Sequence, residues 1–152
     1  MFRNMAGLDI VHVPYKGAAR ALTDLMAGQI QMLFDSSARQ HVEIGKLRAL
    51  ATTGLARWFL LPEVPTLDEL GLKGFQAIAW QGVMGPAGLP VSVVARLNSE
   101  VNAALADTAF KTQLTGLGYE VIADGAVQMA DFIATDAARW RRVVLERGLK
   151  LE

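Results

Sequence analysis

Cysteine is absent from this sequence, and histidine occurs only at positions 12 and 41. Without cysteine the chain can form no disulfide, no thiolate metal site and no cysteine nucleophile. The two histidines are far apart and share no metal-ligand spacing. We therefore expect neither a metal site nor a cofactor.

An excess of charge of one sign is also missing, because 15 basic residues balance 15 acidic residues. Nucleic acid binding depends on a surplus of Lys and Arg that neutralises phosphates, so no nucleic-acid partner is expected. Catalytic motifs are missing too: there is no Gly-x-Ser-x-Gly elbow and no glycine-rich phosphate loop. We expect no catalytic residues and no enzyme activity.

Long hydrophobic runs are absent, although 52% of the residues are hydrophobic. No run approaches the roughly 18 apolar residues that a membrane-spanning helix needs. The first seven residues, Met1 to Gly7, also lack the apolar stretch of a signal peptide. If Met1 is the true start, the sequence predicts a cytoplasmic protein.

The first third of the chain contains an alternation of extended and helical patterns. Strands are expected at 8–13, 30–34 and 47–53, and helices at 17–27 and 38–44. Glycine ends both helices, and Asp35 and Ser36 are good N-caps for the second. This order predicts a parallel sheet with right-handed crossovers, which is an α/β fold.

The rest of the chain turns from extended to helical after Pro90. A short helix at 66–70 is expected from the capping-box spacing of Thr66 and Glu69. Further strands are expected at 75–84 and 119–123, a helical stripe after Pro90, a helix capped by Asp107 and ended by Gly116 or Gly118, and a terminal helix at about 127–147 ended by Gly148.

Two loops that follow expected strands are candidate binding elements. In the first, Val13-Pro14-Tyr15-Lys16-Gly17, the backbone amides of Gly17, Ala18 and Ala19 begin a helix and could point at an anion. In an open α/β sheet, this edge is where ligands bind. The alternative is an ordinary strand-to-helix turn with a solvated Lys16.

The second loop is Phe34-Asp35-Ser36-Ser37. A carboxylate and two hydroxyls could hold water there, or orient donors toward a dicarboxylic ligand. Alternatively, Asp35 and Ser36 only cap the following helix. Since Asp35 would repel a bare carboxylate, we expect it to accept from backbone or water donors. Trp80 could form a wall of a cleft, or it could be a core residue.

The order of these motifs resembles the receptors of tripartite tricarboxylate transporters, known as the TctC or Bug family. The resemblance is carried by residues 13–17, Phe34-Asp35-Ser36, Leu47-Arg48-Ala49-Leu50-Ala51 and Pro86-Ala87-Gly88. It implies a periplasmic receptor with a type II-like periplasmic-binding-protein fold. Such a receptor binds a small carboxylate and can deliver it to membrane transporter subunits.

The resemblance also implies how the chain is divided and which residues bind the ligand. Residues 1–79 correspond to most of a second lobe, and residues 80–152 to a mainly helical return to the first lobe. The expected ligand-binding residues are Tyr15, Gly17, Ala18, Asp35, Ser36 and Trp80.

Family members are roughly twice as long, so the resemblance covers their C-terminal half and the expected fold is incomplete. This leaves an alternative function. A truncated product would bind no solute and would self-associate as a homo-oligomer through apolar helix faces exposed between Val91 and Arg147.

Overall fold

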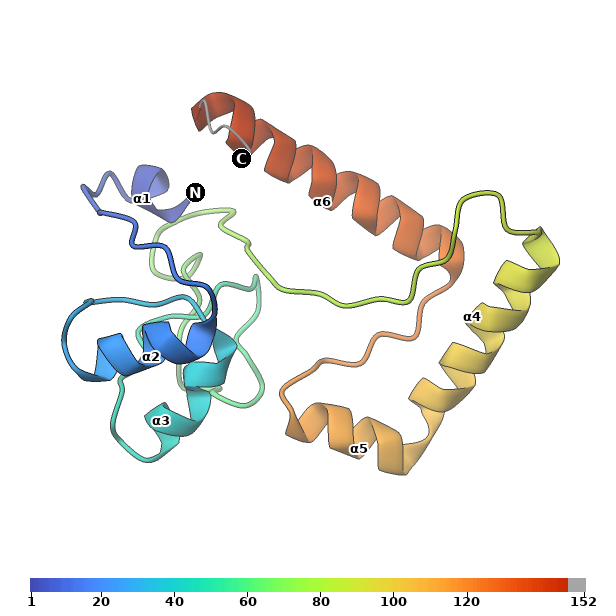
Figure 1. Cartoon of the computed structure of the whole chain (residues 1–152), viewed down its shortest axis with the longest axis horizontal. Helices are drawn as coiled ribbons and strands as arrows, with labels where there is room; N and C mark the ends of the chain where they lie inside the picture. Colours follow the sequence, from blue (N-terminus) through green and yellow to red (C-terminus); the bar gives the residue numbers. More distant parts are fainter. Residues whose placement is uncertain (148–152) are drawn as a thin grey trace. The chain divides into compact units, whose positions relative to one another are not determined.

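The computed structural model describes residues 1–147 and divides the chain into two compact units, Met1–Trp80 and Gln81–Glu152. Figure 1 labels the helices of each unit. The predicted helix end at Gly148 lies outside the described residues. No helix in residues 1–147 combines the length and the apolarity needed to cross a bilayer.

Unit 1 contains short helices joined by irregular segments. They are α1 (Phe2–Met5), α2 (Ala18–Met26), the 3-10 helix η1 (Ser36–Ala38) and α3 (Arg39–Glu43). The predicted helix at 17–27 is confirmed by α2, which buries Ala21 and Leu22. The predicted N-cap is confirmed too, because the Asp35 side chain accepts from the amide of Ser37 at 2.8 Å.

The core of unit 1 is formed by apolar side chains from α2 and from the segment after Arg57. Its buried apolar members are Ala21, Leu22, Leu61, Val64, Leu67 and Phe75. Aromatic rings extend this core, since Phe2 contacts Phe34 edge to face with centroids 5.3 Å apart, and Phe75 at 6.3 Å. Edge-to-face pairs of this kind add to the stabilisation from burial.

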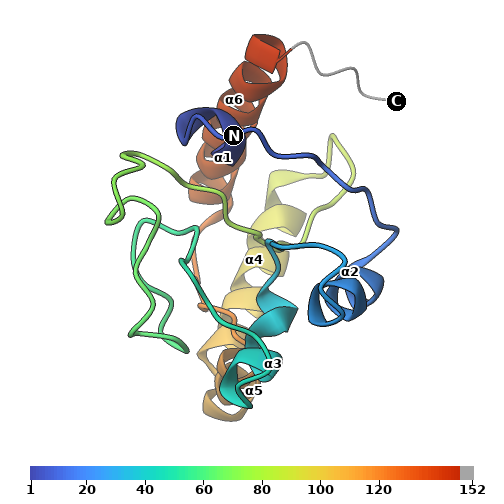
Figure 2. The ribbon, with the colours of Figure 1, turned by 90° about the vertical axis from the view of Figure 1, so that its left-hand side faces the viewer.

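The predicted strands of unit 1 do not form a sheet within the described residues. Thr52 and Thr66 form an isolated parallel bridge, in which the amide of Thr52 donates to the carbonyl of Pro65 at 2.8 Å. The remaining extended segments run as irregular trace in Figures 1 and 2. β-branched residues favour extended backbone locally, but a ladder also needs a neighbouring strand at about 4.8 Å.

The predicted helix at 66–70 is also wrong, although its capping box forms. The segment is a series of hydrogen-bonded turns, with the amide of Leu70 donating to the carbonyl of Thr66 and that of Leu72 to Leu67. The run does not continue as a helix because Gly71, with a φ of 104°, ends it after one turn. Gly74, which follows Lys73, also has a positive φ.

The described part of unit 2, residues 81–147, contains three helices, α4 (Val91–Ala106), α5 (Thr108–Gly116) and α6 (Ala126–Arg147), and α4 contacts both of the others. The helices match the predictions, including the cap, where Asp107 Oδ1 accepts from the amide of Phe110 at 2.8 Å. Residues 119–123, predicted as a strand, have no ladder partner among the described residues.

Two asparagines on α4 connect this helix to the start of α6. Asn98 Nδ2 and Asn102 Nδ2 donate to the backbone carbonyl of Asp124, at 3.1 and 3.3 Å. A second polar contact in unit 2 joins Gln81 Nε2 to the Tyr119 hydroxyl at 3.1 Å. These bonds position the loop that precedes α6.

Large apolar side chains of unit 2 are exposed, as the sequence predicted for its helices. Among residues 81–145, whose side chains the structure describes, the buried class contains no apolar side chain, and Asp136 is its one charged member. Val91, Leu117 and Leu145 are 85%, 73% and 74% exposed. Unit 2 thus has an apolar surface that its own helices leave uncovered.

Candidate functional site

The first candidate binding loop leads into α2. Gly17 is the N-cap residue, and no side chain of the described residues caps the helix there. Ala18 is the first helical residue, so the first amides of α2 have no intrahelical acceptor. Free amides and the helix dipole at such an end favour an anion.

Tyr15 fixes this loop to the helix that follows it. Its hydroxyl donates to Asp24 Oδ2 at 2.8 Å. The hydrogen bond to Asp24 raises the pKa of Tyr15, with burial and the charge of Asp24 acting in the same direction. The phenol therefore stays protonated and positions the loop, while its ring is half-buried.

The second candidate loop is ordered by Asp35. Besides accepting from the amide of Ser37, Asp35 Oδ1 accepts from the hydroxyl of Ser37 at 2.5 Å. Asp35 thus binds donors of its own loop, and Ser36, the first residue of η1, remains exposed. The segment between α2 and η1 runs back toward the start of α2 (Figure 1), as a parallel connection requires.

The other residues singled out in the sequence have different positions. Trp80 is half-buried and is the last residue of unit 1. His12 is exposed, and His41 is half-buried within α3. Among the side chains that the structure describes, no group of three or more acidic or histidine residues is placed to hold a metal ion.

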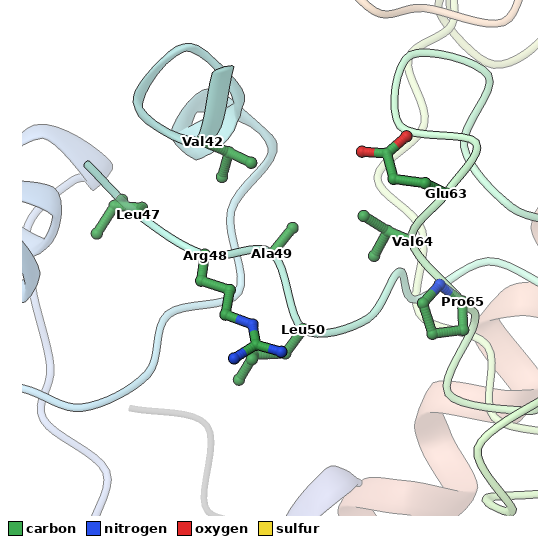
Figure 3. A pocket seen from close by; sticks show the side chains of 8 residues that line it. All are labelled: Val42, Leu47, Arg48, Ala49, Leu50, Glu63, Val64 and Pro65. Atoms are coloured by element: carbon green, nitrogen blue, oxygen red, sulfur yellow. The ribbon is translucent and has the colours of Figure 1, made fainter. Parts of the chain in front are cut away.

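The sequence analysis missed a hollow in unit 1, which lies between residues 42–50 and 63–65. It has a volume of about 470 Å³ and is open to solvent. Figure 3 shows its apolar walls, formed by Val42, Leu47, Leu50, Val64 and Pro65, and its two charged residues, Arg48 and Glu63. The sequence gives little indication of this hollow, because its walls come from two separate segments.

Comparison with known proteins gives matches along almost the whole chain. The model of the family described as "Tripartite tricarboxylate transporter family receptor" matches residues 1–149. A UPF0065 protein in the tcbD-tcbE intergenic region of Pseudomonas sp. (strain P51) is 40% identical over 147 residues. The match covers 95% of this chain and 44% of that relative.

Two solved structures are similar to the chain in three dimensions. R. palustris Rpa4515 with adipate has a TM-score of 0.83 at 33% identity. That match covers 97% of this chain and 50% of the Rpa4515 chain. The periplasmic binding protein BugD has a TM-score of 0.81 at 32% identity. That match covers 99% of this chain and 52% of the BugD chain.

These likenesses confirm the predicted fold class, an incomplete α/β fold of the type II-like periplasmic-binding kind. They also show that the chain spans about half the length of the relatives it matches.

Proposed function

The chain belongs to the tripartite tricarboxylate transporter receptor family, and on this premise we propose that it forms one wall of a cleft that binds a small carboxylate. The observation that carries the proposal is the uncapped start of α2 at Gly17. Amides at such a helix end suit a carboxylate group. The solved structure of Rpa4515 with adipate, a dicarboxylate, supports this ligand class.

Within this wall, the residues have separate roles. The amides of Gly17 and Ala18 donate to one carboxylate of the ligand, and Tyr15 holds their loop in place. Asp35, whose oxygen already accepts from Ser37, orders the second loop so that the Ser36 hydroxyl or a water faces the ligand. Trp80 contributes an aromatic surface.

The proposal extends to the organisation and location of the receptor. Residues 1–79 form most of the second lobe, and residues 80–152 return to the first. The remaining cleft surface belongs to the half of the family fold that this chain does not span. The receptor acts in the periplasm, as BugD does by its description, and delivers its ligand to a membrane transporter.

The test combines the full chain with a polypeptide spanning the other half of a family receptor. Binding of adipate and a panel of small carboxylates is measured by calorimetry. The informative variant is Ala18→Pro, because proline is tolerated at the first helical position but has no N–H to donate. Loss of a hydrogen bond to a charged group should weaken affinity about 10-fold or more.

The matched control is Thr108→Pro, at the first helical position of α5. It makes the same change at a helix start that the proposal does not use, so affinity should be unchanged. Equal affinities for the two proline variants would contradict the role of α2. Failure of the combined halves to bind any carboxylate in the panel would remove the proposal.

A second candidate function is self-association of the chain as a homo-oligomer. The observation that favours it is the exposed apolar surface of unit 2, where Leu145 is 74% exposed. Size-exclusion chromatography with light scattering would show a concentration-dependent oligomer that Leu145→Lys weakens. Leu55→Lys, at a 59% exposed position of unit 1, is the control. A monodisperse monomer at all concentrations would exclude this candidate.

A further inference from the structure

The hollow of unit 1 has three features that the proposed carboxylate site does not use: an open backbone edge, two unpaired charges of opposite sign and apolar walls. From these we infer that the hollow binds an extended peptide segment with an apolar centre between one acidic and one basic residue. Each feature fits one part of such a peptide.

The backbone edge is formed by Arg48, Ala49 and Leu50. Within the described residues 1–147, no hydrogen bond joins the backbone of these three residues to another group. Thr52, two residues further on, is already paired in the bridge to Thr66. The segment is therefore an extended edge with free donors and acceptors, to which a peptide can add as a strand.

The two charges are those of Arg48 and Glu63. Both side chains are exposed, and neither takes part in an ion pair among residues 1–145, whose side chains the structure describes. Figure 3 shows them on opposite walls of the hollow. A peptide that crosses the hollow would meet a cation on one side and an anion on the other, which fixes its direction.

The apolar walls would hold the centre of the peptide. Leu50 is 63% exposed. Val64, across the hollow, is only 6% exposed and belongs to the core of unit 1. An apolar side chain placed between them would cover Leu50. Because the hollow is open to solvent, it suits a segment passing across it better than an enclosed small molecule.

This peptide site is independent of the proposed carboxylate site. The hollow contains the beginning of the extended segment 47–53, whereas the candidate loops at 14–18 and 34–36 follow the ends of their segments. None of the residues of these two loops lines the hollow. Failure of the peptide to bind would leave the carboxylate proposal intact.

The test uses two labelled pentapeptides, blocked at both ends, with the sequences Lys-Val-Leu-Val-Glu and Glu-Val-Leu-Val-Lys. Fluorescence polarisation with the full chain should show that one order binds about five-fold more tightly, the scale of exposed ion pairs. In NMR spectra, the tighter peptide should shift the amide signals of Arg48, Ala49 and Leu50.

Charge exchange provides the decisive variants. Arg48→Glu alone or Glu63→Arg alone leaves two charges of one sign and should remove the order preference. The double exchange should invert it, while Lys46→Glu, an exposed charge outside the hollow, should leave it unchanged. Equal binding of both peptides to the unaltered chain, or no shift at residues 48–50, would overturn the inference.

Discussion

Thr66 and Glu69 hold each other through two reciprocal hydrogen bonds. The amide of Thr66 donates to Glu69 Oε2 at 2.9 Å, and the amide of Glu69 donates to Thr66 Oγ1 at 3.0 Å. Thr66 is completely buried, and Arg57 Nε donates to Glu69 from outside at 2.9 Å. The capping box thus closes a turn that packs against the core and is not followed by a helix.

Replacing Thr66 by valine should destabilise the chain, because it removes the acceptor for the Glu69 amide and preserves the shape of the side chain. We expect the free energy of unfolding in urea to fall by about 1 kcal/mol. Thr23→Val is the control, since the Thr23 hydroxyl only donates to the α2 carbonyl of Ala19. Equal losses at the two positions would contradict a specific role for the box.

Two carboxylates of this turn should make stability depend on pH in the acid range. The amide of Thr66 lowers the pKa of Glu69, and the amide of Gly74 lowers the pKa of Asp68. A carboxylate with a lowered pKa stabilises the fold above its unfolded pKa of about 4. That contribution is lost as the pH falls through the lowered folded pKa.

Denaturation midpoints measured between pH 7 and pH 2 should therefore fall steeply in acid for the unaltered chain. Glu69→Gln combined with Asp68→Asn should flatten the dependence, whereas Glu63→Gln, at an exposed position outside the turn, should preserve it. An unchanged acid slope in the double variant would rule out these two groups as its source.

Tyr15 should titrate at higher pH than an ordinary tyrosine. Because its raised pKa comes first from the hydrogen bond to Asp24, this bond contributes to stability below the unfolded pKa of about 10. The contribution is lost as the pH rises through the folded pKa. Absorbance at 295 nm in a Tyr119→Phe background follows Tyr15 alone. Asp24→Asn should lower its midpoint, and an unmoved midpoint would refute the assignment.

Phe75 should be among the most sensitive core positions, since its side chain is 2% exposed and contacts the Phe2 ring. Phe75→Ala should cost about 3–5 kcal/mol in the free energy of unfolding. Phe59→Ala, at a 42% exposed position paired with Trp58, should cost clearly less. Similar losses from both would mean that Phe75 is not a centre of the core.

Helices were predictable because their signals are local. Asp107 caps α5 from the position next to its first residue, and Gly17 stands directly before α2. The contact between Thr66 and Glu69 was also predicted correctly, but the helix predicted to follow it is a turn. Its outcome depended on how many helical residues followed it, and Gly71, with a positive φ, ends the run after one turn.

The sheet and the hollow were less predictable because both depend on residues distant in sequence. β-branched residues predict extended backbone, but whether Thr52 finds a partner is decided by the position of Thr66. Arg48 was visible in the motif at 47–51, yet nothing in that segment relates it to Glu63. The roles of the candidate ligand residues likewise depend on surface that lies beyond this half of the family fold.

The link between α4 and α6 distributes mutational tolerance unevenly. Asn98 and Asn102 contribute side-chain amides, whereas position 124 contributes only its backbone carbonyl. Every amino acid, proline included, has that carbonyl. A substitution at position 124 therefore leaves the acceptor in place, whereas a substitution at either asparagine removes a donor. A side-chain change in the loop thus preserves a link that a change on α4 weakens.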